Sequence, residues 1–196
     1  MSDVSTDQEL LAQIKQGNKA AFTLLVDKYL QDVVNFTLRY LDQRADAEDV
    51  AQETFTRLWC KAPVWQNRGY TVKTWLFRVA YNLCIDELRK QKPVVFAEAD
   101  DPIIDESAFT DRQLANLNYL SIQSAALNEI PERQRTAITL CVYQGLSNKE
   151  AALVLDVSID ALESLLARGR RKLKQLFKQA TEQPEDIPHE ISNDIN

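Results

Sequence analysis

The 196-residue chain is poor in the residues that build catalytic and metal-binding centres. It has four glycines, three cysteines and one histidine, and it lacks the glycine-rich motifs that cradle phosphates. Cys60, Cys84 and Cys141 are far apart and form no C-x-x-C pair, so we interpret them as small buried side chains. The single histidine, His189, lies in an acidic tail. The composition predicts no metal site, no cofactor and no enzymatic activity of this chain alone.

Long hydrophobic runs are also missing. No apolar stretch approaches the roughly 18 residues that indicate a membrane span. The N-terminus, MSDVSTDQEL, has neither the basic start nor the apolar segment of a secretory signal. We therefore expect a cytoplasmic protein that makes no direct contact with a membrane.

The net charge of −6 hides an uneven distribution of charge along the chain. Residues 66–92 carry six basic and two acidic side chains, and residues 133–178 carry nine basic and four acidic ones. The remaining segments are all net acidic. Two basic blocks separated by acidic segments favour a nucleic-acid partner for each block, which the total charge alone would argue against.

Helical periodicity runs through most of the chain and predicts an all-α fold. We expect helices over 7–16, 18–40, 46–61 and 74–92, a loop over 64–73, and a second helical block over 116–180. The predicted architecture is two small helical domains, an N-terminal helical bundle (1–92) and a C-terminal helix-turn-helix domain (116–180). A flexible acidic linker (93–115) joins them, and the acidic tail (181–196) is predicted to be disordered.

The second block has the pattern of a helix-turn-helix. A helix that opens at Pro131 ends before Gly145, and Ser147 with Glu150 forms a capping box for the next short helix. After the turn at 156–158, a long helix has one leucine-rich face and one basic face. Such a helix fits the major groove of DNA. The alternative is an ordinary helical hairpin with a solvated basic face.

The helix predicted over 74–92 is apolar on most of its surface. Arg78, Asn82, Asp86 and Arg89 follow one another at spacings of four, four and three residues, so they form one narrow polar row. Flanking aromatic residues could stack on unpaired bases while the cations hold phosphates. The alternative is a central core helix whose polar row only meets solvent.

The helix predicted over 46–61 has a different polar side. Asp46, Asp49, Gln52 and Glu53 lie opposite its apolar residues. Asp49 and Glu53 are four residues apart, but no histidine or basic cluster is present to tune them for acid–base chemistry. We interpret this side as a protein-binding face, with a merely solvated face as the alternative.

Three strings in order resemble the bacterial sigma factors of the sigma-70 family. They are D-A-E-D-V-A-Q-E-T-F (46–55), T-W-L-F-R-V-A-Y-N (74–82), and I-P-E-R-Q-R (130–135) followed by G-L-S (145–147). The short connector between the second and third strings is typical of the extracytoplasmic-function (group IV) members. The resemblance covers about residues 7–92 and 118–178.

The resemblance implies a function and partners. It implies a subunit that directs promoter-specific initiation by core RNA polymerase, contacting the β′ clamp helices and the β subunit, and that is held inactive by an anti-sigma factor. The first domain would correspond to sigma region 2 and the second to region 4. The acidic linker would thread toward the RNA path of the polymerase.

The resemblance also implies roles for individual residues. Polymerase binding would use Asp46, Asp49, Gln52 and Glu53. Recognition and melting of the −10 element would use Trp65, Arg68, Trp75, Arg78, Asn82 and Arg89. Recognition of the −35 element would use Lys149, Ser164, Arg168, Arg170, Arg171 and Lys172.

The recognition helix departs from the family pattern at two positions. Glu163 stands where relatives have a basic residue, and Leu165 stands where they have arginine. We interpret Leu165 as a packing change. Glu163 would repel phosphate but could accept a hydrogen bond from a cytosine amine, so the −35 sequence that is read should differ from that of relatives.

A second function stays open at this point. A stand-alone helix-turn-helix regulator with an N-terminal protein-interaction domain would also carry the second basic block. Such a regulator would not need Trp75, Asn82 or the acidic face of helix 46–61. It would also bind duplex DNA tightly without polymerase, whereas two small basic patches on an acidic chain predict weak binding.

Overall fold

The computed structural model describes residues 3–41, 43–66, 69–91, 127 and 129–182. The predicted linker over 93–115, nearly all of the predicted tail, and Arg68 lie outside these residues. The described part consists of helices and the turns between them, with no strand in it, which confirms the all-α prediction. Within the same ranges, none of the helices combines the length and the apolar character that a membrane span requires.

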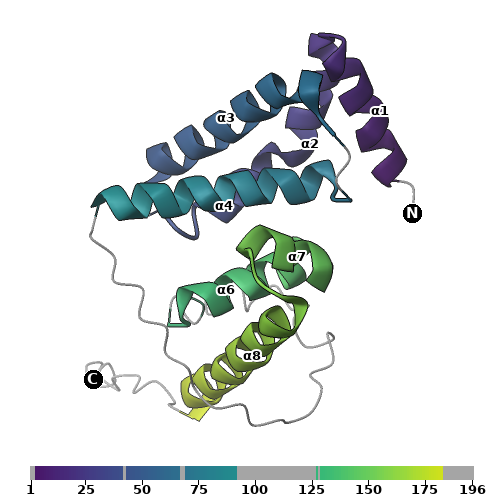
Figure 1. Ribbon diagram of the computed structural model, residues 1–196. Helices are drawn as coiled ribbons and strands as arrows, with labels where there is room; N and C mark the ends of the chain where they lie inside the picture. Colours follow the sequence, from purple (N-terminus) through teal and green to yellow (C-terminus); the bar gives the residue numbers. More distant parts are fainter. Residues whose placement is uncertain (1–2, 42, 67–68, 92–126, 128, 183–196) are drawn as a thin grey trace, which may run out of the picture.

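The N-terminal group contains four α-helices and one short 3₁₀ turn (Figure 1). They are α1 (Asp3–Lys15), α2 (Lys19–Thr37), α3 (Arg44–Lys61), η1 (Ala62–Val64) and α4 (Val72–Gln91). The predicted helices are therefore present with shifted ends. Helix α1 starts four residues before its predicted beginning, α2 ends at Thr37, and α4 starts two residues earlier than predicted.

The break between α1 and α2 follows from local chemistry. Gly17 adopts a positive φ of 82°, which side chains other than glycine rarely tolerate. The Asn18 side chain then accepts hydrogen bonds from the backbone N–H groups of Ala20 (3.0 Å) and Ala21 (3.2 Å). These bonds satisfy donors that have no partner in the first turn of a helix.

The N-terminal group buries a core between α2, α3 and α4. Phe36 and Phe77 are fully buried and pack edge to face, with ring centroids 5.2 Å apart. Helix α1 is joined to α2 by buried Asp7, which accepts hydrogen bonds from the Tyr29 hydroxyl and from Lys28 Nζ (2.8 Å for the latter). Because one side of α3 and one side of α4 are buried in this core, the opposite side of each helix lies outside it.

The C-terminal group is a helix-turn-helix with one additional helix in front of it. It contains α6 (Glu132–Ile138), the π-helical turn η4 (Thr139–Tyr143), α7 (Asn148–Leu155) and α8 (Ile159–Glu182). The prediction of one regular helix up to Gln144 is wrong in its second half. There the chain widens into the π turn, where Gln144 N–H donates to Thr139 O, five residues back.

The capping box predicted for α7 is confirmed. Ser147 Oγ accepts a hydrogen bond from Glu150 N–H, and Ser147 N–H donates to Glu150 Oε2 (3.0 Å). Gly145 adopts the left-handed conformation expected of it, with φ of 64°. Asp156, also left-handed with φ of 56°, ends α7, and Ser158 caps α8 through Ala161 N–H.

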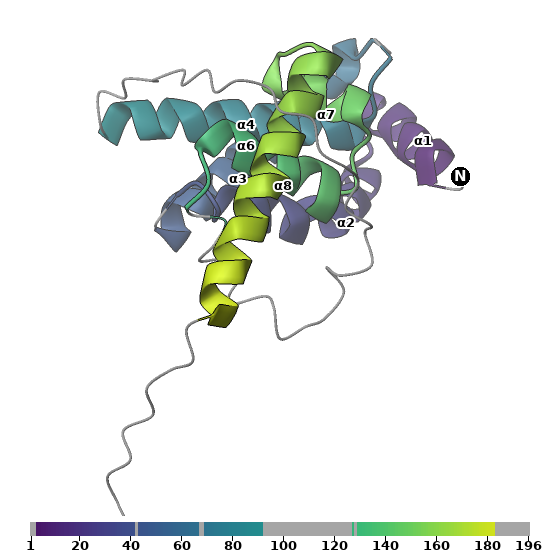
Figure 2. The same cartoon turned by 90° about the horizontal axis from the view of Figure 1, so that it is seen from below.

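The two groups pack against each other, which the sequence analysis did not predict. Helix α4 lies along α7, and buried residues of both groups form one continuous hydrophobic cluster. Figures 1 and 2 show α4 between α3 and the C-terminal helices, with α8 on the side of the molecule remote from α3. The face of α4 that turns away from the N-terminal core is therefore the face that meets α7.

Candidate polymerase and nucleic-acid surfaces

The acidic side of α3 lies on the surface. Asp49, Gln52 and Glu53 are exposed and Asp46 is half-buried, while Ala47, Ala51 and Phe55 on the opposite side are buried in the core. Glu53 forms an exposed ion pair with Arg57 at 2.8 Å, which contributes little to stability because both groups are solvated. The four predicted polymerase-binding side chains are thus brought together on one accessible helix face.

The polar row of α4 is also present. Asn82, Asp86 and Arg89 are exposed, and the Arg78 side chain is 42% exposed. Arg89 lies 3.8 Å from Asp86 within the row, and Arg78 Nη2 lies 3.7 Å from Asp156 Oδ1 of the C-terminal group. The row therefore begins at the contact between the two groups and continues outward along α4 into solvent.

Aromatic rings gather at the start of α4. The Trp65 ring packs edge to face on Tyr70 (centroids 5.9 Å apart) and on Trp75 (5.5 Å). Trp65 is half-buried. Its carbonyl oxygen accepts a hydrogen bond from Lys15 Nζ at 2.9 Å, which ties the segment to α1. Arg68, predicted to act here, lies outside the described residues.

A small cleft of about 190 Å³ brings together part of the predicted −10 set. Trp75, Arg78 and Asn82 line it from α4, and Leu153 of α7 closes its other side. Tyr70 lines the same cleft and was missed by the sequence analysis. The alternation of Trp65, Tyr70 and Trp75 with basic residues is the signal that could have identified it.

The basic face of α8 lies away from α4 and is open. Arg170, Arg171 and Lys172 are exposed, as is Lys149 at the start of α7, while Ser164 and Arg168 are half-buried. The opposite face of α8 is buried against α6 and α7 through Leu162, Leu165, Leu166 and Leu173. All six predicted −35 residues therefore belong to the helix-turn-helix, with the cations toward solvent.

The structure explains the two positions that depart from the family pattern. Leu165 is 9% exposed, which confirms its interpretation as a packing residue. Glu163 is exposed, and its Oε1 accepts a hydrogen bond from Asn148 Nδ2 at 3.2 Å. Glu163 thus joins the start of α8 to the first turn of α7 and remains near the surface that would face DNA.

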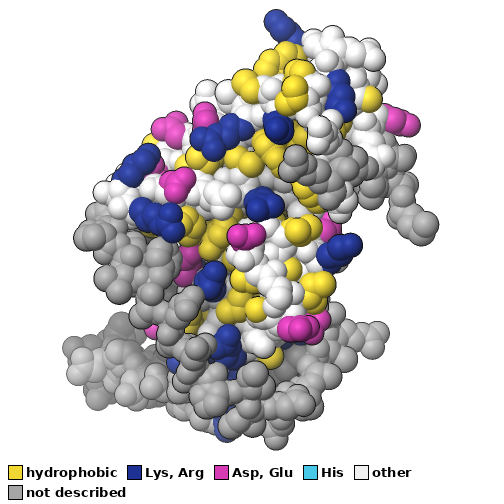
Figure 3. All heavy atoms as spheres, in the orientation of Figure 1, with side chains coloured by type: hydrophobic (Ala, Val, Ile, Leu, Met, Phe, Trp, Pro, Cys, Tyr) yellow, Lys and Arg dark blue, Asp and Glu magenta, His cyan; other side chains and the backbone are white. Residues whose placement is uncertain are grey.

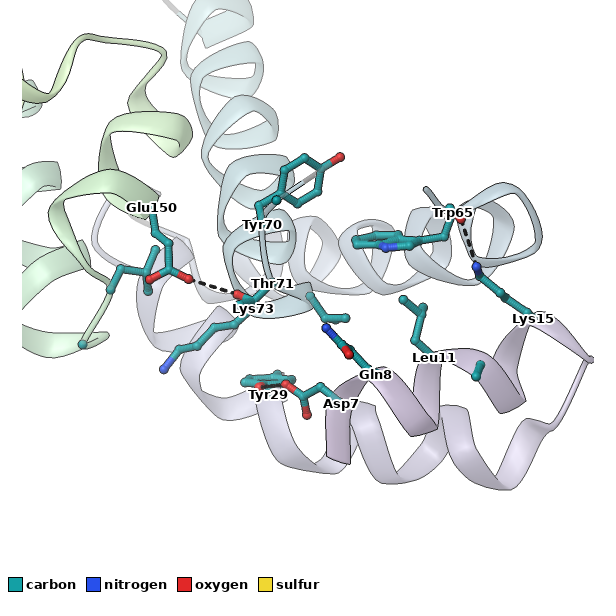
Figure 4. A pocket seen from close by; sticks show the side chains of 15 residues that line it. Asp7, Gln8, Leu11, Lys15, Tyr29, Trp65, Tyr70, Thr71, Lys73 and Glu150 are labelled. Atoms are coloured by element: carbon teal, nitrogen blue, oxygen red, sulfur yellow. Dashed lines mark hydrogen bonds between the residues drawn. The ribbon is translucent and has the colours of Figure 1, made fainter. Parts of the chain in front are cut away.

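A larger cavity of about 560 Å³ lies where α1 and the segment before α4 meet the turn before α7 (Figure 4). Trp65 and Leu11 line one end, and Glu150 lines the other. Glu150 Oε1 accepts hydrogen bonds from Thr74 Oγ1 (2.8 Å) and Thr71 Oγ1 (3.2 Å), while its Oε2 accepts from Ser147. One carboxylate therefore serves both the capping box of α7 and the start of α4.

Two ionisable side chains where the N-terminal and C-terminal groups meet, Glu150 and Tyr81, have shifted pKa values. Burial raises the pKa of Glu150, but hydrogen bonds from Ser147, Thr74 and Thr71 outweigh it and leave that pKa below its usual value. Burial, with a smaller contribution from the Glu132 carboxylate, raises the pKa of Tyr81 to about 12. Both groups therefore keep their usual neutral-pH charge states.

No cluster in the described residues suggests metal chemistry. Among these residues, no three His, Cys, Asp or Glu side chains lie close enough together to hold a metal ion. Figure 3 shows basic and acidic side chains interspersed over the visible face, with hydrophobic side chains between them.

Family models identify the two groups separately. The model of Sigma-70 region 2 matches residues 25–94, and the model of Sigma-70 region 4 matches residues 124–173. The ECF RNA polymerase sigma factor SigW of Bacillus subtilis is 30% identical over 184 residues, covering 86% of this chain and 95% of that protein. SigM of the same organism is 34% identical over 152 residues, covering 76% and 90%.

Solved structures are also similar to most of this chain. CnrH in complex with the cytosolic domain of CnrY is similar with a TM-score of 0.67 and 26% identity, covering 89% of this chain and 98% of that one. The sigma factor RpoE in complex with the anti-sigma factor NepR, from Bartonella quintana, gives a TM-score of 0.62 and 28% identity, covering 80% and 96%.

Proposed function

The chain belongs to the extracytoplasmic-function (ECF) family of RNA polymerase sigma factors, and from this we propose how its three surfaces divide the work of promoter-specific initiation. The acidic face of α3 binds core RNA polymerase at the β′ clamp helices. The polar row and aromatic cluster of α4 bind the −10 element, and α8 binds the −35 element. Polymerase supplies the chemistry, so the chain itself is not an enzyme.

The observation that carries the proposal is that each of the three surfaces has exposed polar side chains and lies on a different helix. Asp49 and Glu53 point outward from α3, Asn82 from α4, and Arg171 from α8. Each belongs to a helix whose other face is buried, so the orientation of each surface is fixed by packing. Residues 1–92 and 116–180 would act as the two functional domains.

Polymerase binding is tested by reversing the charge on α3. Asp49→Lys/Glu53→Lys places two cations where we propose a contact with the β′ clamp helices. We expect at least a tenfold loss of affinity for core polymerase, measured by fluorescence anisotropy, with an unchanged circular dichroism spectrum. The matched control is Glu9→Lys/Asp27→Lys, which makes the same charge change at exposed positions of α1 and α2. Retained affinity in the α3 variant would overturn the assignment.

Promoter binding through α8 is tested by salt dependence. Arg171→Ala and Lys172→Ala each remove one cation from the surface proposed to face phosphates. With the polymerase holoenzyme on promoter DNA, we expect each variant to reduce the slope of log affinity against log salt by about 1. Lys61→Ala, at the exposed end of α3, should leave the slope unchanged.

Run-off transcription separates this function from a stand-alone regulator. We expect the chain to direct initiation only together with core polymerase and to bind duplex DNA weakly by itself. Nanomolar binding to duplex DNA without polymerase, combined with no initiation in its presence, would favour the regulator and contradict the proposal.

We also propose an anti-sigma factor as a partner, acting in the cytoplasm. The similarity to CnrH, solved with the cytosolic domain of CnrY, and to RpoE, solved with the anti-sigma factor NepR, supports this assignment. A purified partner should compete with core polymerase for the chain in a gel-filtration assay. If both bound at once without loss of transcription, the inhibitory role would be wrong.

A further inference from the structure

We propose that Lys15, in the last turn of α1, is a positioning residue for −10 recognition. It holds the main chain of Trp65 and thereby fixes the aromatic cluster formed by Trp65, Tyr70 and Trp75. The inference rests on the proposed function of that cluster. It extends this function to α1, which contributes no residue to the three proposed surfaces.

Helix α1 is a fixed support for the Lys15 side chain. Leu11 and Ile14 are buried in the N-terminal core, and the carboxylate of buried Asp7 is hydrogen-bonded to side chains of α2. Helix α1 also packs against η1, the turn that ends just before Trp65. The place from which Lys15 extends is therefore set by the core.

The contact between Lys15 and Trp65 joins residues that are 50 positions apart. Lys15 Nζ donates to Trp65 O at 2.9 Å, and Figure 4 shows the side chain extending from α1 to that carbonyl. Trp65 directly follows η1 and has an extended backbone, with φ of −62° and ψ of 127°. An ammonium group at the end of α1 is also favoured by the helix dipole. The bond thus holds the chain at the point where it leaves the turn.

A cavity lies under the segment that follows. This cavity of about 560 Å³ lies between α1 and residues 69–73 (Figure 4). Residues that line a cavity lack packing partners on that side, so polar anchors matter more for their position. The Lys15–Trp65 bond anchors the beginning of the segment. At its end, Thr71 Oγ1 accepts a hydrogen bond from Thr74 N–H at 3.1 Å.

A shift of Trp65 would be passed on to the proposed −10 cleft. Its ring packs edge to face on Tyr70 and Trp75, with centroids 5.9 and 5.5 Å away. Trp75 in turn lines the cleft of about 190 Å³ together with Asn82. Stacking on an unpaired base requires that the rings stay at fixed places. Lys15 therefore acts on −10 DNA through Trp65 and does not itself touch the DNA.

Three variants isolate the hydrogen bond from the charge. Lys15→Met removes the donor but keeps an unbranched side chain, and Lys15→Arg keeps a cation that can donate to a carbonyl. The matched control, Lys19→Met, makes the same change at an exposed position at the start of α2. Because Lys15 is exposed as well, we expect all three variants to have the circular dichroism spectrum of the wild type.

Hydrogen exchange on the free full-length chain tests the anchoring. In Lys15→Met, we expect backbone amides in a peptide that covers residues 69–75 to exchange about fivefold faster, because one hydrogen bond that restrains the segment is lost. Lys15→Arg and Lys19→Met should exchange like the wild type. A peptide from the middle of α8 should be unaffected in every variant.

Selection of promoter variants by the polymerase holoenzyme tests the effect on recognition. We expect Lys15→Met to reduce discrimination between bases at the −10 element about threefold and to leave discrimination at the −35 element unchanged. Lys15→Arg should restore the −10 preference. A general loss of stability would lower the activity on all promoters alike and would not change one element selectively.

The outcomes separate this inference from the proposed function. Unchanged exchange at residues 69–75 in Lys15→Met, or an equal loss of discrimination at both elements, would overturn the positioning role even if the wild-type chain directs transcription. Equal effects in Lys15→Met and Lys19→Met would also overturn it, because they would show that charge alone matters. Failure of the wild-type chain in run-off transcription would instead reject the sigma-factor function, while faster exchange in Lys15→Met would still show that Lys15 holds the segment.

Discussion

Glu163 accepts a hydrogen bond from Asn148 across 3.2 Å, joining the recognition helix α8 to the first turn of α7. Both side chains are exposed. The acidic residue is therefore part of the helix-turn-helix surface itself, at a position where relatives are expected to carry a cation. Its orientation is set by Asn148, and its second carboxylate oxygen remains available to a base edge.

We predict that Glu163 determines the base preferred at one −35 position. Glu163→Ala should lower discrimination for cytosine there by about 1–3 kcal/mol, because the carboxylate accepts from the cytosine amine. Selection of promoter variants by the holoenzyme, followed by sequencing, measures the preference. Asn148→Ala is the companion variant and should weaken the preference only partly. An unchanged base profile in Glu163→Ala would contradict the assignment.

Gly169 sets the distance between α6 and α8. A Cβ at this position would lie 2.7 Å from Ile138 Cδ1 and 3.3 Å from Gln134 Cβ. We predict that Gly169→Ala lowers the free energy of unfolding by about 1 kcal/mol, since overpacking outweighs the gain in helix propensity. Urea denaturation measures the change.

The control for Gly169 is a double variant. Ile138→Val removes the Cδ1 atom that the new Cβ would meet. Gly169→Ala/Ile138→Val should therefore be more stable than the sum of the two single changes predicts. Strict additivity would show that the contact with Ile138 is not the source of the strain.

We expect the free energy of unfolding to depend on pH through Glu150. Although burial raises its pKa, the hydrogen bonds from Ser147, Thr74 and Thr71 hold the pKa below its usual 4.5, so its ionised form stabilises the folded state at neutral pH. That contribution is fully present above the unfolded pKa and is lost as the pH falls through the lower folded pKa. We predict that Glu150→Gln costs about 1–2 kcal/mol at pH 7.

The difference between wild type and Glu150→Gln should shrink as the pH is lowered through the range below 4.5. Urea denaturation at a series of pH values measures it. Glu9→Gln, on the exposed surface of α1, controls for the change in net charge. A difference that stays constant with pH would show that Glu150 contributes through shape and not through its charge.

The three thiols should react at different rates. Cys60 is exposed, so its interpretation as a buried side chain is wrong. Burial, aided by the nearby Glu132 carboxylate, raises the pKa of the Cys84 thiol to about 12. Burial also raises the pKa of Cys141, which is half-buried. We predict that a maleimide at pH 7.5 modifies Cys60 first, Cys141 more slowly, and Cys84 only after unfolding, as measured by mass spectrometry.

Cys60→Ser supplies the control for the thiol prediction, because the fast phase should vanish in this variant while the slower one persists. Rapid modification of Cys84 in the folded protein would mean that the interior of α4 opens far more readily than its packing indicates.

The local features of the fold could be predicted because their partners lie a few residues apart. The capping box of Ser147 and Glu150 and the left-handed turn at Gly145 depend on short spacings that the chain itself imposes. The buried leucine face of α8 and the exposed acidic face of α3 follow in the same way from a period of 3.6 residues. The helix types, the candidate surfaces and the family resemblance were therefore all available from the sequence.

The helix ends were less predictable. Residues 139–143 have the same apolar pattern as a regular helix, but here they adopt a π turn that brings Leu146 N–H to Leu140 O. Trp65 lies in the predicted loop over 64–73, yet it packs on Tyr70 and Trp75 and is half-buried. In both cases packing against other side chains decided the outcome, and local preference did not oppose it strongly.

The sequence by itself determined that the chain is helical, which face of each helix is apolar, and which polar side chains share a surface, because these depend on periodicity and short-range capping. Only the tertiary structure decided that α7 lies on α4. The pairs Tyr40–Thr136 and Thr74–Glu150 are 96 and 76 residues apart, and no spacing along the chain selects such partners. Periodicity predicts that one face of a helix is buried, but which element covers that face depends on shape and hydrogen bonding in three dimensions.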